Sequence, residues 1–300
     1  MISKKTKLIT VIVFTVGLFL YWAVLAMSHT KYHLANYWWE AALSAEFIIF
    51  GIFGILISKK WSWFKSSMGS GVLLISLGLI AWGLAQAGWT YYVIKYPNQQ
   101  NPNYLDLNIT YFLSIPFWFV GMFRLSKATG AKYGLKSALA KLGVAVLILV
   151  MLAVSYYLLV DVARGGTSYF HHNTFGGVFF DLGYAAGDAI NLTLALAIFG
   201  LSWKYLGGMF KQPILLVLLA FASIYLADLI YSYYDGKGLY YNGQWDDTLY
   251  LLTGAIFGAG IVLLEPATRV YSGNRAAAKA GSGSVEMPGR MPMPAHKEGK

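Results

Sequence analysis

The chain contains no cysteine, and only 12% of its 300 residues are charged. The absence of cysteine excludes disulfides, thiolate metal sites and cysteine nucleophiles. A soluble domain carries about 25% charged residues, so this chain has no room for a large soluble domain. Hydrophobic residues make up 57% of the chain and aromatic residues 17%. This composition predicts an all-α fold, a polytopic bundle of membrane helices.

Familiar catalytic motifs are also missing from the sequence. The chain has no G-x-S-x-G nucleophile motif, no H-E-x-x-H zinc motif and no histidine inside an apolar segment. Its paired glycines stand at the ends of apolar segments, where they indicate turns and close helix contacts rather than phosphate-binding loops. We therefore expect no enzymatic activity and no cofactor.

Eight apolar segments are long enough to cross a bilayer, which takes about 20 residues. The first follows three lysines, as a signal peptide does, but its apolar run is longer than a signal peptide's. We expect a retained anchor, although Val24-Leu25-Ala26 leaves cleavage open. The transmembrane domain is expected over residues 1–265, and residues 271–300 are expected to form a disordered cytoplasmic tail. The expected spans are Leu8–Met27, Asn36–Ile57, Ser70–Ile94, Tyr104–Arg124, Ala138–Val160, Val178–Trp203, Pro213–Tyr234 and Asp247–Leu264.

The basic residues predict the orientation of these spans. The sequence has 23 Lys and Arg, and all but four of them fall on the side that holds both termini; the four are Lys31, Lys95, Arg164 and Lys237. By the positive-inside rule both termini are cytoplasmic, in a multi-pass protein of the plasma membrane. The net charge of +10 therefore reflects topology and contact with the lipid bilayer, and we expect no nucleic-acid partner.

The two halves of the chain, about 1–124 and 136–265, have related patterns. Gln86, followed by Trp89 and two tyrosines, aligns with Asp228, followed by Tyr231 and two tyrosines. Glu46 precedes Gln86 by the same spacing by which Asp188 precedes Asp228. These matches predict a four-plus-four parallel repeat, whose halves are related by an axis near the membrane normal. Chance similarity between apolar helices is the competing interpretation.

Polar residues inside the spans are the candidate site, because an ionised carboxylate is costly in hydrocarbon. Such residues predict either a site for a ligand, cation or proton or a hydrogen-bonded network that fixes helix register. Asn108 and Asp247 are expected to cap the outer ends of the fourth and eighth helices. The candidate polar core consists of Glu46, Gln86, Trp89, Tyr184, Asp188, Asn191, Asp228 and Tyr231.

Four of the five histidines map to the outer side. His29 and His33 have the spacing that places two imidazoles on one helical face, as a metal site requires. With His171 and His172 they form the candidate metal site. Ordinary loop histidines are the competing interpretation.

The sequence resembles the polytopic sensor region that precedes GGDEF, EAL and histidine-kinase domains in microbial signalling proteins. The resemblance covers most of residues 70–265 and rests on diffuse aromatic motifs. The matching stretches are Gly83–Tyr92, Asn108-x-x-Tyr111-Phe112 with Pro116, Tyr184-Ala-Ala-Gly-Asp188, and Ala227-Asp228 to Tyr233 followed by Asp247.

The sequence departs from that pattern at three points. Asn108 replaces an Asp, Ala185 replaces a Pro, and only a short segment follows the last span where an output domain would stand. The resemblance implies a sensor or signalling module that responds to a small ligand, ion or pH and acts through a cytoplasmic or membrane partner or a homo-oligomer. It does not name the stimulus. A small-solute or ion transporter and a structural assembly protein are the alternatives.

Overall fold

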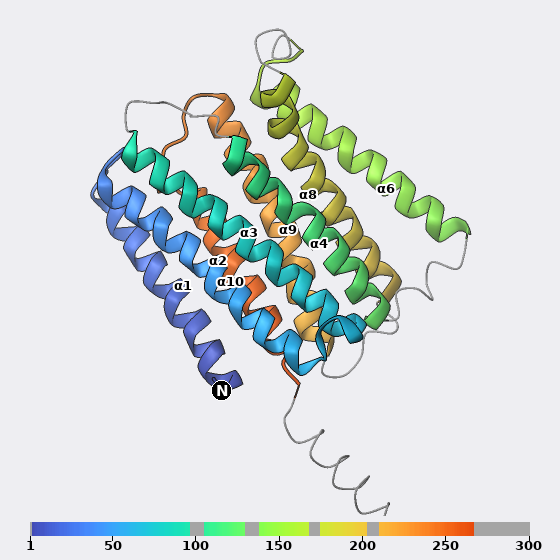
Figure 1. The fold of residues 1–300 in the computed structure, drawn as a ribbon. Coiled ribbons are helices and arrows are strands. Elements are labelled where there is room, and N and C mark those ends of the chain that lie inside the picture. The colour runs from blue at the N-terminus through green and yellow to red at the C-terminus, as the bar shows by residue number, and fades with distance from the viewer. Residues whose placement is uncertain (1, 97–104, 130–137, 168–174, 203–209, 267–300) are drawn as a thin grey trace, which may run out of the picture. The chain divides into compact units, whose positions relative to one another are not determined.

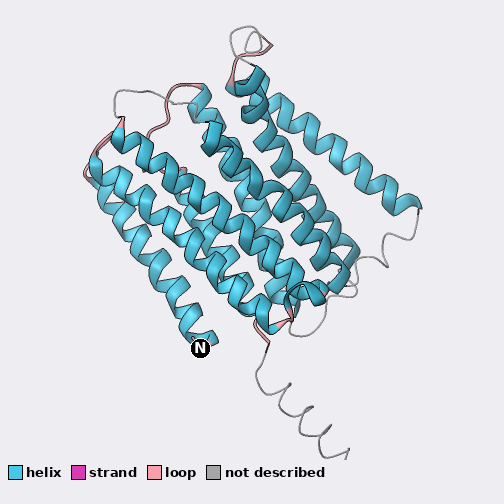
Figure 2. Cartoon of the chain, viewed as in Figure 1, coloured by secondary structure: helices cyan, strands magenta, loops and turns pink. Residues whose placement is uncertain are grey.

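The computed structural model describes residues 2–96, 105–129, 138–167, 175–202 and 210–266. All regular structure in these ranges is helical, which confirms the all-α prediction (Figure 2). A 3-10 turn, η1 (Trp63–Lys65), precedes α3, and a π-helical segment, η2 (Tyr157–Ala163), continues α6. The predicted tail, residues 271–300, lies outside the described ranges. The eight α-helices of the described ranges are α1 (Lys4–Met27), α2 (Leu34–Lys60), α3 (Ser67–Lys95), α4 (Leu105–Thr129), α6 (Ala138–Tyr156), α8 (Phe175–Ser202), α9 (Lys211–Gly236) and α10 (Asp247–Leu263).

Six of these helices are long and apolar enough to cross a membrane: α1, α2, α3, α4, α9 and the segment Lys141–Ala163. Helix α10 is a shorter apolar helix, and α8, which carries Asp188, is not among the six. Apolar side chains such as Ile12, Val13 and Leu149 are more than half exposed on α1 and α6. Outward-facing aliphatic surface of this extent requires a lipid environment. The chain is therefore a multi-pass helical membrane protein.

Six helices contact one another in a closed ring, in the order α2, α3, α4, α8, α9, α10 and back to α2. Helix α1 packs outside this ring against α2 and α10, and α6 packs outside it against α8 (Figure 1). Contacts α2–α10 and α4–α8 join the first four helices to the last four. The interior of the ring is therefore built by both halves of the chain.

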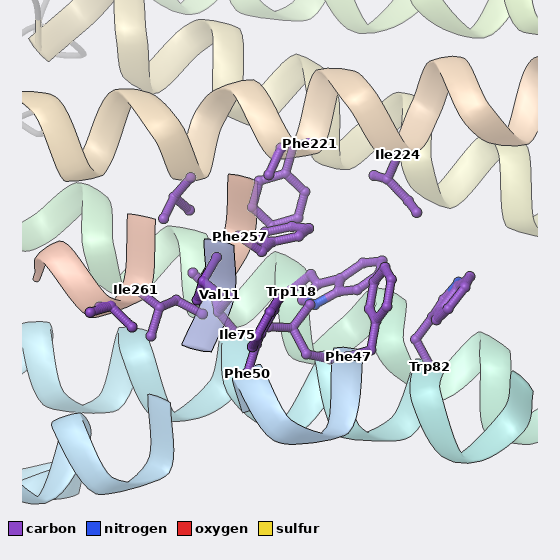
Figure 3. Close-up of a cluster of buried hydrophobic side chains, with 14 of the residues drawn as sticks. Val11, Phe47, Phe50, Ile75, Trp82, Trp118, Phe221, Ile224, Phe257 and Ile261 are labelled. Carbon is purple, nitrogen blue, oxygen red and sulfur yellow. The ribbon is translucent and has the colours of Figure 1, made fainter. Parts of the chain in front are cut away.

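Aromatic side chains fill one part of that interior (Figure 3). Phe47 stacks on Trp82 with ring centroids 4.1 Å apart. Trp118 stacks on Phe257 at 5.8 Å, and Phe257 meets Phe221 edge to face at 5.0 Å. Such pairs add about 0.5–1.5 kcal/mol each beyond the area that they bury. These rings come from α2, α3, α4, α9 and α10, so this core fixes the positions of five of the six ring helices.

Glycine allows two of the closest helix contacts. A Cβ at Gly54 of α2 would lie 1.8 Å from the Ser76 hydroxyl of α3, and a Cβ at Gly78 would lie 2.4 Å from the Trp118 indole. Membrane helices use small residues in this way, because close backbone approach gains van der Waals contact. Gly78 thus makes room for the Trp118 ring at the centre of the bundle.

A buried ion cluster ties three helices together at the end of the bundle where α1 begins. Lys7 Nζ lies 2.7 Å from Glu265 Oε2, just beyond α10, and Lys60, at the end of α2, bonds the other carboxylate oxygen. Burial disfavours the charge on Glu265, but hydrogen bonds from Lys60 and Lys7 outweigh this effect and lower its pKa. The beginning of α1 and the ends of α2 and α10 therefore share one end of the bundle.

Candidate functional site

The connection from α9 to α10 folds back over the opposite end of the bundle. Its backbone turns at Gly238 and Gly243, which have φ angles of 65° and 79°. A Cβ at Gly243 would also lie 2.9 Å from the Asn36 amide nitrogen, so only glycine fits there without strain. This turn points the Gly243 N–H inward and places Asn242 where its Oδ1 accepts from Trp89 Nε1 at 3.2 Å.

Two carboxylates converge on that single N–H group. Gly243 N lies 3.0 Å from Glu40 Oε1 and 2.8 Å from Asp247 Oδ2. Glu40 Oε2 accepts from Gln86 Nε2 at 2.6 Å, and the Tyr240 hydroxyl lies 3.3 Å from Asp247 Oδ1. The two carboxyl groups also interact directly. Two charges this close in a low dielectric repel strongly, so a proton or a cation between them would be stabilised.

A second carboxyl pair lies between α8 and α9. Asp188 and Asp228 interact directly, and the Tyr250 hydroxyl of α10 donates to Asp228 Oδ1 at 2.5 Å. Asp188 is 3% exposed, and among the described residues no hydrogen bond reaches its Oδ1. A buried acceptor without a donor costs about 1–3 kcal/mol or more. This oxygen therefore lacks the donor that its burial calls for.

Both pairs face a cavity of about 190 Å³ inside the helix ring. Every helix of the ring contributes to its wall, and so do Arg164, just after η2, and Tyr240 of the α9–α10 connection. The aromatic core lies directly beneath, since Trp82 and Trp118 line the cavity as well. A space of this size holds several waters or a small solute. Besides its tyrosines and tryptophans, the described polar side chains of the wall are Glu40, Gln86, Asn108, Ser114, Arg164, Asp188, Asp228, Ser232, Asp235 and Asp247.

Two groups in the α9–α10 connection have shifted acid strength. Burial raises the pKa of Asp246 to about 6, against the opposing effects of its own backbone N–H and of Gln244. Burial and the nearby Asp247 and Glu40 carboxyl groups raise the pKa of the Tyr240 phenol well above its usual value. Tyr240 therefore remains a neutral hydrogen-bond donor, while Asp246 titrates close to neutral pH.

Most of the predicted polar core does line this cavity. The members that line it are Gln86, Trp89, Tyr184, Asp188, Asp228 and Tyr231. The Tyr184 hydroxyl donates to the Asn108 carbonyl oxygen at 2.6 Å, a bond that joins α8 to α4. Residues predicted from two distant parts of the sequence therefore line the same cavity.

Two predicted members of the polar core lie elsewhere. Glu46 accepts from Thr15 Oγ1 at 2.9 Å and faces α1 and Gly254 of α10, so it is not the structural counterpart of Asp188. Glu40, six positions earlier on α2, is the residue that contacts Gln86. Glu46 therefore lies on a different side of α2. Asn191 is fully buried but does not line the cavity. The expected grouping of Glu46 and Asn191 with the other polar residues was wrong.

The expected helix caps also differ in detail. Helix α4 begins at Leu105, so Asn108 lies inside its first turn and is not the cap. Helix α10 begins at Asp247, and Asp246 occupies the N-cap position without a capping hydrogen bond from its side chain. The Asp247 carboxylate accepts from Gly243 N, within the connection that precedes the helix. Both residues line the cavity and so belong to the site rather than to an outer rim.

The candidate metal site is not formed by the residues that the structure describes. His29 has a left-handed φ of 51°, and His33 is the extended capping residue of α2, where its Nδ1 accepts from Ala35 N at 3.3 Å. The two imidazoles therefore do not share a helical face. His171 and His172 lie outside the described residues. Within the described part of the chain, no group of three or more His, Asp or Glu side chains could hold a metal ion.

The sequence did not reveal Glu40, which forms the first carboxyl pair with Asp247, or Tyr240, which hydrogen-bonds Asp247. Glu40 follows Trp38 and Trp39 near the beginning of an apolar helix, where an acid resembles an ordinary interfacial residue. A charged residue within the first two turns of a span was nevertheless a usable signal. Tyr240 lies in a loop with no periodic pattern, so only the fold could place it.

No protein-family model matches the chain, and neither the curated proteins nor the solved structures compared with it give a match. The resemblance to sensor regions of signalling proteins therefore stays a prediction. Any functional conclusion has to come from the cavity itself.

Proposed function

We propose that this protein is an integral membrane sensor-type module that binds a small ligand, ion or proton in the cavity between its helices. The observation that carries the proposal is the convergence of two carboxyl pairs on one cavity that all six ring helices line. An occupant of that cavity would touch elements from both halves of the chain. Binding would therefore change the relative stability of different helix arrangements, which is the physical requirement for a switch.

A binding role fits the lining better than a catalytic role. The described wall of the cavity contains Ser114 and Ser232, and the bases beside them are carboxylates, with no histidine or lysine. The Ser114 hydroxyl donates to the Tyr111 carbonyl oxygen at 2.6 Å. A nucleophile needs a base within hydrogen-bonding reach. We further propose that the ligand-bound and ligand-free forms of the module interact differently with a cytoplasmic or membrane partner, or with a second copy of the chain.

The proposal includes eight crossings in two related halves, with α8 and α10 as the spans beyond the six long apolar ones. Matched contacts support it: the Tyr111 hydroxyl donates to Gln86 between α4 and α3, and the Tyr250 hydroxyl donates to Asp228 between α10 and α9. Gln86 also bonds Glu40 of α2, as Asp228 contacts Asp188 of α8. An acid, a polar residue and a tyrosine thus recur on helices of the same order in each half.

The distribution of basic residues supports cytoplasmic termini, with the cavity toward the outer face of the plasma membrane. The cysteine-free chain allows a direct test with single-cysteine variants. We expect a membrane-impermeant maleimide to label Lys237→Cys in intact cells and to label Lys65→Cys only after lysis. The reverse pattern would reverse the proposed orientation.

The binding proposal is tested on the purified full chain in nanodiscs. Intrinsic tryptophan fluorescence and thermal stability are measured with a panel of sodium, ammonium, alkylamines, short alcohols, carboxylates and sugars, from pH 5 to pH 8. We expect at least one probe or pH step to change both signals. Ala185→Leu, which fills space in the wall, should abolish the change, while Gly17→Leu on the open face of α1 should preserve it. A protein that responds to no probe and to no pH step would not be a sensor of this kind.

A transporter is the second candidate, and the matched polar groups of the two halves favour it, because carriers commonly place such groups at a repeat interface. Flux of sodium, protons and alkylamines into proteoliposomes would separate the candidates. Flux that Asp188→Asn and Asp228→Asn both abolish supports transport. Absent flux, or flux that neither variant changes, leaves the sensor proposal standing. A loss of thermal stability in both variants would instead indicate that the acids are purely architectural.

A further inference from the structure

We propose that the cavity is a site for a small organic cation, a primary or secondary ammonium group that binds Asp188. This assignment rests on the proposed ligand-binding function and narrows it to one chemical class. The Asp188 Oδ1 atom carries the argument, because no hydrogen bond reaches it within the described residues although the side chain is buried. An ammonium N–H in the cavity would supply the missing donor and the opposite charge.

The rest of the local network leaves that position open. Asp228, the neighbour of Asp188, already accepts from Tyr250 at 2.5 Å. The Glu40 and Asp247 pair is satisfied by Gly243, Gln86 and Tyr240. A proton shared between Asp188 and Asp228 would be the other way to relieve the pair. Among the described residues that line the cavity, the carboxylate oxygen still without a protein donor therefore lies on the α8 side.

Four aromatic rings that contact one another line the cavity beside the acid pair. Tyr184 lies one helical turn before Asp188 on α8, and its ring centroid is 6.3 Å from that of Tyr111. The ring centroid of Trp82 lies 5.9 Å from that of Tyr111 and 5.4 Å from that of Tyr250. The Tyr250 hydroxyl in turn donates a hydrogen bond to Asp228, one member of the acid pair. Ring faces attract a cation by about 0.5–2 kcal/mol each when water is excluded.

The charge and size of the cavity restrict the ligand further. Among the described residues, the wall holds one basic side chain, Arg164, against the carboxyl groups of Glu40, Asp188, Asp228, Asp235 and Asp247. A metal ion is not favoured, because no group of three such ligands comes together in the described residues. The acids are instead spread around an aromatic space of about 190 Å³. The ammonium group of a short alkylamine would bond the Asp188 carboxylate, and its alkyl chain would pack against the aromatic rings.

The test uses the full chain in nanodiscs and three probes of similar shape at pH 7: n-butylamine, 1-butanol and butyrate. Binding is followed by tryptophan fluorescence and by isothermal titration calorimetry. We expect n-butylamine to bind at least tenfold more tightly than 1-butanol, and butyrate not to bind. Asp188→Asn should weaken the amine at least tenfold. The matched control is Glu46→Gln, which alters a buried carboxylate outside the cavity and should change the amine affinity less than twofold.

The outcomes separate this inference from the proposed function. If 1-butanol or butyrate binds as well as n-butylamine, or if Asp188→Asn leaves amine binding unchanged, the cation class is overturned and a ligand site remains. If none of the three binds but sodium, or a short alcohol, carboxylate or sugar of the wider panel, does, the organic-cation assignment is overturned and a ligand site remains. If nothing in the panel binds and no pH step has an effect, both fail. The comparison of the three probes needs no variant, so it holds even if Asp188→Asn does not fold.

Discussion

Glu40 and Asp247 accept hydrogen bonds from one backbone N–H group, that of Gly243, at 3.0 and 2.8 Å. Glu40 lies on α2 and Asp247 begins α10, so this single donor joins the two halves of the bundle at the roof of the cavity. Gly243 can donate in this direction because its φ of 79° turns the peptide inward. The pair therefore links the conformation of the α9–α10 connection to helix packing.

We expect Asp247→Asn to preserve the structure and Asp247→Ala to weaken it. The Asn side chain keeps an oxygen for Gly243 N and offers its amide to the Tyr240 hydroxyl, which can accept. It also removes one charge from the pair. The Ala variant removes the Asp247 bonds to Gly243 N and to the Tyr240 hydroxyl, while Gly243 N keeps Glu40 as an acceptor. A hydrogen bond to a charged group contributes about 1.5–3 kcal/mol. Thermal unfolding in detergent should show Asn equal to or above the wild type and Ala several degrees below. A lower melting temperature for Asn than for Ala would contradict this account.

Asp246 should make stability depend on pH just below neutrality. Its pKa is raised from 3.8 to about 6 in the folded protein. The folded state therefore binds more protons than the unfolded state between about pH 4 and pH 6, and stability falls as the pH rises through that window. Asp246→Asn should remove this loss and stabilise the protein at pH 7 by on the order of 1–3 kcal/mol, with no effect at pH 3.5. A variant that gained nothing at pH 7 would show that Asp246 is not penalised in the folded state.

Glu265 should give the opposite pH dependence. Its pKa is lowered in the folded protein by Lys60 and Lys7, despite burial. Its contribution is therefore complete above the ordinary value of about 4.5 and is lost as the pH falls through the lower folded value. Glu265→Gln should destabilise the protein at pH 7 by about 3–5 kcal/mol, because two lysines lose their buried partner. The difference from the wild type should shrink at pH 3. Lys7→Met should cost more than Lys60→Met, since Lys7 is 1% exposed and Lys60 keeps 26% of its side chain exposed.

The sequence predicted the helices well but predicted only part of the site. Apolar run length locates a span with little help from tertiary structure, and Asp188 and Asp228 stood out because acids are rare in such runs. Which acids meet depends on helix rotation and depth, and these follow from packing details such as Gly54 against Ser76. Without that information, Glu46 was grouped with the polar residues that line the cavity.

Loop geometry explains the remaining misses. The i,i+4 spacing of His29 and His33 indicates a shared face only if the segment is helical, and a positive φ at His29 breaks it. Tyr240 reaches the cavity because the connection folds inward after Gly238. Neither turn leaves a periodic signal in the sequence. Tyrosines of α4 and α10, Tyr111 and Tyr250, each donate to a polar side chain of the helix that precedes them.

Those tyrosines allow a paired test of the two halves. Tyr250 donates to the Asp228 carboxyl group, and Tyr111 donates to the Gln86 amide oxygen. Hydrogen bonds to charged groups contribute about 1.5–3 kcal/mol and those between neutral groups about 0.5–1.5 kcal/mol. Tyr250→Phe should therefore lower the melting temperature more than Tyr111→Phe. In an Asp228→Asn background the two Tyr→Phe effects should become similar, because both tyrosines then donate to an amide. Equal losses in the wild-type background would mean that Asp228 carries no charge, and that its pair with Asp188 holds a proton at the pH of the measurement.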